Sequence, residues 1–142
     1  MIHIFSDTDI ILDVVTGRLP YSVEASALFT LIEEGQIRSS ASSLSFSNIY
    51  YVLRKYATHQ RVVSRLKELS ELVEILNVDK SIIKRALQSK FKDLEDSIQY
   101  YAALSNPEIE VLVTRNIKDY KVSELPVMTP ETFLKTYSHT SR

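Results

Sequence analysis

The sequence predicts an α/β fold: a three-layer α/β/α domain built on a mostly parallel central sheet of four to five strands. Two observations predict this class. Short apolar runs rich in β-branched residues alternate with longer segments of helical periodicity, and no tight Asn-Gly or Asp-Gly pair joins two strands into a hairpin. Parallel strands connected through helices use right-handed crossovers, which place helices on both faces of the sheet. At 142 residues, the chain is expected to form one domain spanning 1–142.

In the first half of the chain, an apolar run at the N-terminus predicts a strand that ends at Asp7. Gly17 and Gly35 are expected to end two helices, because glycine readily adopts the left-handed backbone that closes a helix. Apolar residues at spacings of three and four predict the other helices. The predicted elements are a strand over 2–7, helices over 10–15 and 21–34, a strand over 37–41, and helices over 43–57 and 59–73.

The second half continues the alternation. Asp79 and Asp93 are helix N-cap residues placed directly before apolar helical patterns, and Pro130 is suited to the first turn of a last helix. The predicted elements are a strand over 74–78, helices over 80–87 and 94–104, strands over 111–114 and near 127–128, and a helix from 130. Ligands of such folds bind beyond the carboxyl ends of the strands, so functional residues are expected there.

Composition excludes several classes of protein. The chain has no Cys, which excludes disulfides, thiolate metal sites and cysteine nucleophiles and fits a reducing, cytoplasmic setting. With 2 Gly, a glycine-rich phosphate-binding loop is not expected. No apolar run approaches the roughly 20 residues of a membrane helix, and the first residues lack the pattern of a secretory signal. We expect a soluble, unprocessed protein with no membrane partner.

The charged residues are unevenly distributed, although the formal net charge is only −1. Residues 1–53 hold 2 basic against 6 acidic side chains, residues 54–92 hold 10 against 4, and residues 93–142 hold 5 against 8. This distribution suits a protein that binds a polyanion along the middle segment and a cation between the acidic ends. A solvated helical face accounts for the basic segment equally well.

Oxygen-bearing side chains gather where the predicted strands end. Because these are hard oxygen ligands, and crowded carboxylates repel unless a cation offsets their charge, the set favours magnesium or manganese and a phosphate substrate. Taken singly, each acid is better explained as a helix cap, and it is their joint placement that favours a metal site. The residues are Asp7 and Asp9 after the first strand, Asp93 and Asp96 at the start of a helix, and Thr114, Asn116 and Asp119 after the strand over 111–114.

Taken in order, these segments resemble the PIN domain, a family of small metal-dependent nucleases that includes VapC-like toxins. Residues 4–13 (IFSDTDIILD) are similar to the opening strand of the family, with its first metal-binding acid at Asp7. Residues 93–103 (DLEDSIQYYAA) resemble the helix-opening acidic motif, which places the metal-facing acid at Asp96 with Asp93 beside it. Residues 113–120 (VTRNIKDY) are similar to the segment after the fourth strand, which includes Thr114 and Asp119. The resemblance implies a single PIN-like domain over nearly the whole chain.

The chain departs from the family pattern at one helix. Residues 47–55 (SNIYYVLRK) resemble the helix that usually carries a Glu, but the matching residue is Asn48. Asparagine remains an oxygen ligand and supplies no charge, so metal affinity and water activation are expected to fall unless another acid compensates. Asn116 is a similar departure, which leaves Asp119 as the nearest carboxylate.

The resemblance implies a magnesium- or manganese-dependent endoribonuclease, a phosphodiester hydrolase that could act as the toxin of a toxin–antitoxin pair. The implied metal ligands are Asp7, Asp96, Asp93 and Asp119, with Asn48 and Thr114 orienting water or phosphate. The implied partners are RNA, bound along the basic helices between 54 and 92, a small antitoxin protein, and a second copy of the chain in a homodimer.

Two other functions stay open on the sequence. One is a PIN-like module that binds RNA or protein with weakened catalysis because of Asn48. The other is a phosphotransfer enzyme of the haloacid-dehalogenase type, suggested by Asp7-Thr8-Asp9 after a strand and by Thr114 after another. An enzyme of that type needs a pair of acids on a further strand after Thr114, whereas in this chain the acidic pair precedes Thr114.

Overall fold

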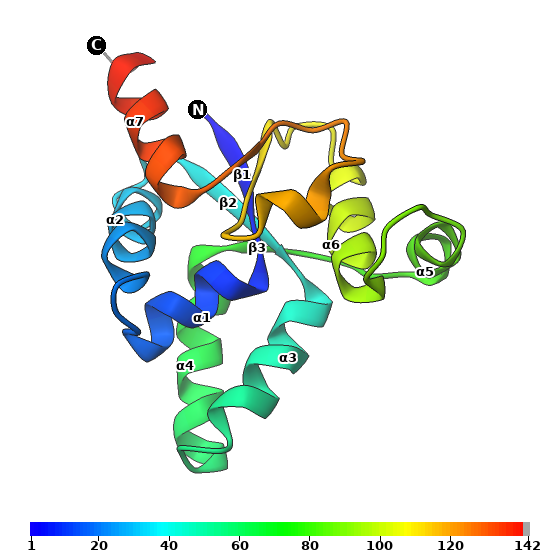
Figure 1. The fold of residues 1–142 in the computed structure, drawn as a ribbon. Coiled ribbons are helices and arrows are strands. Elements are labelled where there is room, and N and C mark those ends of the chain that lie inside the picture. Colours follow the sequence, from blue (N-terminus) through cyan, green and yellow to red (C-terminus); the bar gives the residue numbers. More distant parts are fainter. Residues whose placement is uncertain (141–142) are drawn as a thin grey trace.

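The computed structural model describes residues 1–140, in which five strands alternate with seven α-helices and one 3₁₀ helix (Figure 1). None of the helices over this range is long and apolar enough to cross a membrane. In chain order the elements are β1 (His3–Ser6), α1 (Thr8–Thr16), α2 (Ser22–Glu33), β2 (Arg38–Ser42), α3 (Ser43–Leu53), α4 (His59–Leu72), β3 (Glu74–Leu76), α5 (Lys80–Leu87), α6 (Leu94–Leu104), β4 (Val111–Val113), η1 (Ile117–Tyr120), β5 (Val127–Met128) and α7 (Pro130–Thr140).

The five strands form one sheet in the order β3-β2-β1-β4-β5, and every adjacent pair is parallel. The central strand β1 lies between β2 and β4, with Phe5 beside Ser40 on one side and Ser6 beside Val113 on the other. The carboxyl ends of these three strands therefore meet at one edge of the sheet. The predicted parallel sheet of four to five strands is confirmed.

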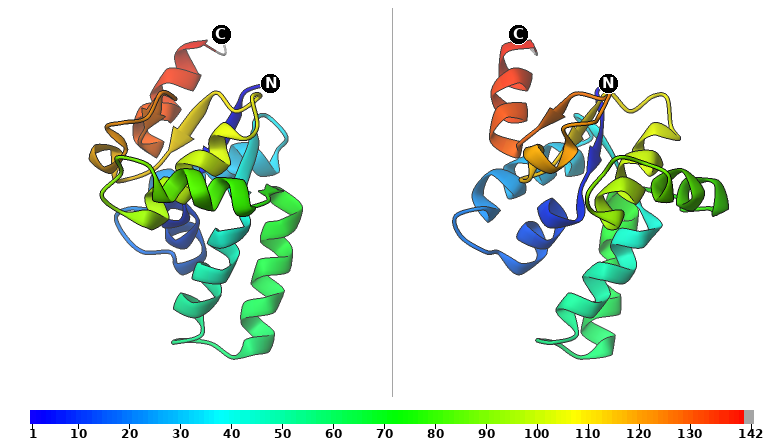
Figure 2. Two further views of the ribbon diagram at one scale, coloured as in Figure 1. Left: turned by 90° about the vertical axis from the view of Figure 1, so that its right-hand side faces the viewer. Right: turned by 45° about the vertical axis from the view of Figure 1, so that its right-hand side comes forward.

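Helices cover both faces of the sheet, which confirms the predicted three layers (Figures 1 and 2). Successive residues of a strand point to opposite faces, so Ile4 packs into a core with α1, α2 and α7 while Phe5 packs into a second core with α5 and α6. In β4, Val111 and Val113 join the first core and Leu112 joins the second. All of these side chains are buried, as is typical of the near-continuous apolar strands of parallel sheets.

Local signals account for most element boundaries. Asp7 caps α1, since its Oδ1 accepts the N–H of Thr8 at 2.8 Å, and Gly17 closes that helix with a φ of 66°. Helix α3 ends at Leu53, four residues before the predicted end. The reason is the next cap: Thr58 has an extended backbone and accepts the N–H of Arg61 at the start of α4, so residues 54–57 form a turn. The 3₁₀ helix η1 was not predicted.

A buried polar network joins three helices below the carboxyl end of the sheet. The side chain of Gln99 in α6 is fully buried, accepts from the Ser42 hydroxyl at 2.7 Å, and donates to the hydroxyls of Thr8 at 3.1 Å and Ser45 at 3.0 Å. Thr8 and Ser45 also bond to each other at 2.7 Å. Since these residues belong to α6, β2, α1 and α3, the network fixes the relative positions of the helices that carry Asp96, Asp7 and Asn48.

Candidate active site

Asp7 lies at the centre of a group of polar side chains beyond β1 and β4. Its Oδ1 accepts the N–H of Thr8, while Oδ2 accepts hydrogen bonds from the hydroxyls of Thr114 and Tyr120, both at 2.9 Å. Burial raises the pKa of the Asp7 carboxyl, the charge of Glu95 adds to this, and the three hydrogen bonds oppose it by favouring the ionised form. Asp7 is therefore held in one orientation by donors from three segments of the chain.

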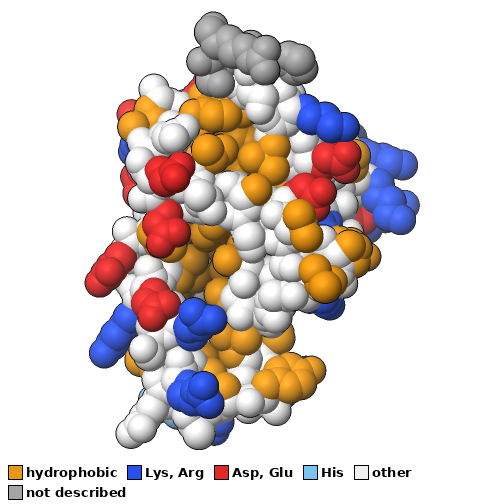
Figure 3. Space-filling model, turned by 90° about the vertical axis from the view of Figure 1, so that its left-hand side faces the viewer, with side chains coloured by type: hydrophobic (Ala, Val, Ile, Leu, Met, Phe, Trp, Pro, Cys, Tyr) orange, Lys and Arg blue, Asp and Glu red, His pale blue; other side chains and the backbone are white. Residues whose placement is uncertain are grey.

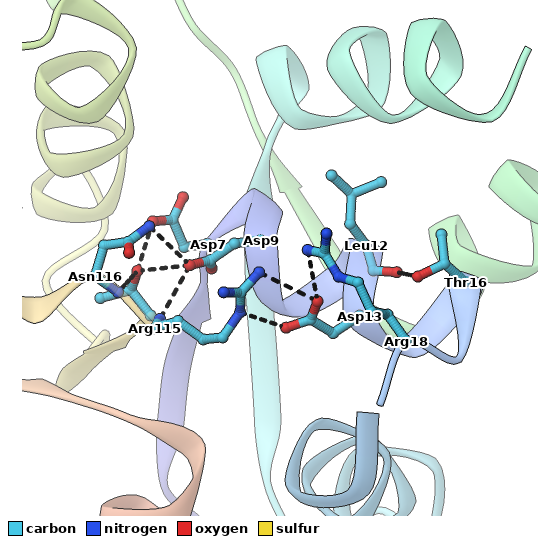
Figure 4. Close-up of polar contacts among 9 residues, drawn as sticks. Asp7, Asp9, Leu12, Asp13, Thr16, Arg18, Arg115 and Asn116 are labelled. Atoms are coloured by element: carbon cyan, nitrogen blue, oxygen red, sulfur yellow. Dashed lines mark hydrogen bonds and ion pairs between the residues drawn. The ribbon is translucent and has the colours of Figure 1, made fainter. Parts of the chain in front are cut away.

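Asp9, two residues after Asp7 in the first turn of α1, is held by the turn after β4 (Figure 4). Its Oδ2 accepts from the Thr114 hydroxyl at 3.2 Å, the Arg115 backbone N–H at 3.0 Å and the Asn116 side-chain amide at 3.4 Å. Burial and the neighbouring Asp7 raise the pKa of Asp9 to about 6. Its other oxygen, Oδ1, is buried and has no hydrogen-bond partner among the residues that the structure describes.

A buried ion pair anchors that turn to α1. Asp13 is fully buried and accepts from Arg115, with 2.7 Å between Nε and Oδ2 and 3.3 Å between NH2 and Oδ1. Arg18 adds a contact of 3.2 Å to Oδ1 (Figure 4). The guanidinium of Arg115 also lies 3.9 Å from the ring centroid of Tyr21. The two-point contact fixes the Arg115 side chain. Its backbone N–H is thereby kept in place for Asp9.

Helix α6 brings the second group of acids. Asp93 caps the helix by accepting the N–H of Asp96 at 2.9 Å, so the two carboxylates lie together at the first turn of α6. Asp96 is half-buried. Burial raises its pKa to about 7, and the charges of Asp93, Asp7, Asp119 and Glu95 add to the effect in that order. Residues from α1, α6 and η1 thus place their negative charges around one carboxyl group.

Glu95, on the first turn of α6, contacts α3. The side-chain amide of Asn48 donates to Oε1 of Glu95 at 2.8 Å. Burial and the neighbouring Asp93 raise the pKa of Glu95, while the hydrogen bond from Asn48 lowers it. Asn48 therefore contacts the acidic group by way of Glu95. Glu95 is an additional carboxylate at the edge of that group.

A groove beside α6 combines these acids with basic side chains. Its volume is about 360 Å³, and Asp93, Asp96 and Asp119 line it together with four lysines. The lysines are Lys90 and Lys92 from the segment before α6, and Lys118 and Lys121 from η1 and the residue after it. Carboxylates bordered by ammonium groups form a site that attracts a phosphate while keeping acids for a cation.

The donors fit a hard divalent cation in their chemistry. All are oxygens, and one buried carboxylate oxygen of Asp9 has no partner among the described residues. Burial raises the pKa of Asp96 to about 7, and the neighbouring acids add a repulsion that a cation would relieve. Within residues 1–138, no three acidic or histidine side chains have converged closely enough to hold an ion as they stand. Binding would require the carboxylates to draw together.

The structure brings the six residues predicted from the sequence into this region. Thr114 lies within hydrogen-bond distance of two carboxylates, Asp7 and Asp9, so it orients acids; Asn48 does the same for Glu95. The six residues are Asp7, Asn48, Asp93, Asp96, Thr114 and Asp119.

Three parts of the site were not assigned from the sequence. Tyr120 was placed in the motif after β4 with no role, Glu95 lay unremarked between Asp93 and Asp96, and the pairing of Asp13 with Arg115 had no signal in the local sequence. Of these three parts, only Glu95 had a signal in the sequence. It lies with Asp93 and Asp96 at the first turn of one predicted helix, so its carboxylate could have been assigned to the same acidic group.

The fold and the site together define an α/β domain with an acidic centre at the carboxyl edge of a parallel sheet. The chain belongs to the PIN domain family, whose model matches residues 3–118. Membership of this family removes the haloacid-dehalogenase alternative. The family assignment made from the sequence is confirmed.

Known proteins resemble the chain over most of its length. It is 28% identical to Ribonuclease VapC1 of Aquifex aeolicus over 143 residues, which covers 95% of each protein. Among solved structures, a toxin–antitoxin complex from Klebsiella pneumoniae matches with a TM-score of 0.64 at 26% identity, covering 89% of this chain and 97% of that one. VapC20 of Mycobacterium tuberculosis, a toxin that cleaves the sarcin-ricin loop, matches with a TM-score of 0.60 at 15% identity, covering 77% and 86%.

Proposed function

We propose that this protein is a metal-dependent endoribonuclease of the PIN type, with magnesium or manganese as its cation. The observation that carries the proposal is that acids from the cap of α1, from α6 and from η1 lie around Asp96 at the carboxyl edge of the sheet. Asp7, Asp93, Asp96 and Asp119 would hold the cation. When bound, such a cation activates a water and stabilises the leaving oxygen of a phosphodiester.

The residues around the acids prepare them for this chemistry. Tyr120 and Thr114 hold Oδ2 of Asp7 in one orientation, and the anchored turn at Arg115 does the same for Asp9. Fixed ligands reduce the reorganisation needed to bind a cation and to align water with phosphate. Asp119 is exposed and is the acid best placed to act through water.

RNA is the proposed substrate class. The related VapC1 is a ribonuclease, and the lysine-lined groove beside Asp96 suits a polyanionic backbone. Two of its lysines, Lys90 and Lys92, belong to the basic middle segment, and Lys118 and Lys121 come from the acidic C-terminal third of the sequence. The groove therefore draws the phosphate-binding charges from two separate parts of the chain.

We further propose that the protein is the toxin of a toxin–antitoxin pair in the cytoplasm, inhibited by a small protein partner, and that it forms a homodimer. Solved relatives include toxin–antitoxin complexes, and a groove of about 230 Å³ is lined by apolar and charged side chains of α1, α2 and α4. Figure 3 shows the side of the molecule that carries α1 and α2, where exposed apolar side chains lie among acidic and basic ones. Such a surface suits an amphipathic protein segment. Light scattering of the purified protein tests the dimer.

The test of the nuclease is cleavage of a panel of structured RNAs with magnesium or manganese. The unmodified protein is compared with its Asp96→Asn variant and with a chelated sample. We expect metal-dependent cleavage that the variant loses by at least about 100-fold, because one ligand and its charge are removed. Cleavage that survives chelation, or that the variant retains, would overturn the proposal.

The second candidate is a PIN domain that binds RNA or protein and cleaves poorly. Asn48 favours it, because this residue supplies no charge. RNA binding measured by fluorescence anisotropy separates the two functions. Retained binding without cleavage by the unmodified protein, under either metal, identifies the binding module.

A further inference from the structure

The contact between Asn48 and Glu95 joins α3 to α6 at the edge of the acidic group. The 2.8 Å hydrogen bond runs from the amide nitrogen of Asn48 to Oε1 of Glu95. No cationic side chain among those that the structure describes forms an ion pair with Glu95. The negative charge of Glu95 is therefore left without a counter-charge, although its carboxylate is held in place.

The charge of Glu95 acts on the acids at the centre of the site. Glu95 lies in the first turn of α6 beside Asp93, which caps the helix, and its negative charge acts on both Asp7 and Asp96. Asp96 follows Glu95 directly in the first turn of α6, and Asp7 comes from α1. A negative charge that both acids sense is placed to interact with a cation that both would bind.

Asn48 suits this arrangement better than an acid would. A carboxylate at position 48 would face Glu95 with like charge at hydrogen-bond distance, and one of the two groups would have to turn away or take up a proton. The amide of Asn48 instead donates a hydrogen bond to Oε1 of Glu95, a contact that favours the charged form of the carboxylate. The α3 helix thus contributes a positioning group, and α6 contributes the charge.

We propose that Glu95, held by Asn48, supplies the metal site with the carboxylate that the α3 position lacks. This inference rests on the proposed metal-dependent function and assigns Glu95 to the cation-binding set, directly or through water. Asn48 is then a positioning residue that acts through Glu95. The departure of Asn48 from the family pattern is compensated within this chain.

The test measures Mn²⁺ binding to the purified protein, by calorimetry or from the electron paramagnetic resonance signal of free Mn²⁺. Glu95→Gln keeps the shape of the side chain and the acceptor oxygen for Asn48, but removes the charge. We expect about tenfold weaker Mn²⁺ binding. Glu71→Gln is the matched control, because Glu71 is an exposed glutamate of α4 and its loss changes the net charge equally. The control is expected to bind like the unmodified protein.

A double-mutant cycle tests the role of Asn48. Asn48→Ala is expected to weaken Mn²⁺ binding several-fold, and to have no further effect when Glu95→Gln is already present, because Asn48 acts through Glu95. The exchanged pair Asn48→Glu with Glu95→Gln, which moves the charge from α6 to α3, is expected to recover binding. Circular dichroism confirms that each variant is folded.

The outcomes separate this inference from the proposed function. Mn²⁺ binding that is equal in the unmodified protein and Glu95→Gln overturns the inference alone. Binding that depends on Glu95 without any RNA cleavage supports the inference and contradicts the nuclease. An unmodified protein that binds no Mn²⁺ contradicts both.

Discussion

The hydroxyl of Tyr120 donates a 2.9 Å hydrogen bond to Oδ2 of Asp7 and ties η1 to the N-terminus of α1. Burial and the negative charges of Asp7 and Asp96 raise the pKa of Tyr120 far above its usual value, so the hydroxyl is protonated at neutral pH. Tyr120 is therefore a donor at that pH. The contact stabilises the ionised form of Asp7 inside an acidic environment.

Replacing Tyr120 with Phe removes this donor and leaves the ring in place. The pKa of Asp7 should rise further, and metal-dependent cleavage should fall about tenfold at pH 7 with its pH profile displaced to higher pH. Thermal unfolding should show a loss of about 1 kcal/mol. Tyr51→Phe, whose hydroxyl is on an exposed residue, is the control and should leave both properties unchanged. An unshifted pH profile in Tyr120→Phe would contradict the role assigned to the hydroxyl.

The acidic centre should make the metal-free protein less stable as the pH rises. The pKa of Asp96 is about 7 in the folded state against an ordinary value of 3.8, so the folded protein holds this proton more tightly than the unfolded chain does. Stability is therefore lost as the pH increases between about 4 and 7. Since Asp96 is partly exposed, screening reduces the effect to on the order of 1 kcal/mol.

The Asp96→Asn variant tests this directly in chelated buffer. At pH 8 the variant should unfold roughly 3 °C above the unmodified protein, because the repulsion with Asp93 and Asp7 is gone. At pH 3 the difference should largely vanish, since Asp96 is then mostly protonated in both the folded and the unfolded state. A variant that is less stable at pH 8 would show that repulsion does not dominate at this site.

The lysines of the groove should contribute to RNA binding more than those elsewhere. Lys118→Ala is expected to weaken RNA binding, because one phosphate contact is lost. The slope of log affinity against log salt concentration should become shallower by roughly 1. Lys55→Ala, after the end of α3, lies outside the residues that line the groove and is the matched control. Equal losses in both variants would indicate that the basic segment binds RNA diffusely.

The buried network at Gln99 should be costly to disrupt. Gln99→Leu preserves the volume of the side chain but leaves the hydroxyls of Ser42, Thr8 and Ser45 short of a partner. We expect a loss of about 2–4 kcal/mol in the free energy of unfolding, measured with urea. A loss below about 0.5 kcal/mol would mean that the three hydroxyls satisfy one another without the amide.

Much of the fold could be predicted from the sequence, because its signals are local. Alternating apolar runs, the caps at Asp7 and Asp93 and the glycines at 17 and 35 each act within a few residues, and all lie where the structure has them. The predicted site residues follow from the same logic. In a parallel sheet the carboxyl ends of neighbouring strands lie at the same edge, which predicts that Asp7 and Thr114 lie together. The hydrogen bond between them is in agreement.

The tertiary structure decided which groups contact those acids. The sequence by itself determined the class of fold, the family and the carboxylates at the strand ends. Only the packing of α3 against α6 paired Asn48 with Glu95, and only the turn of η1 brought Tyr120 to Asp7, across 47 and 113 residues of chain. Such contacts depend on where whole helices settle on the sheet. That position is set by the combined packing of many side chains, so no local pattern in the sequence encodes it.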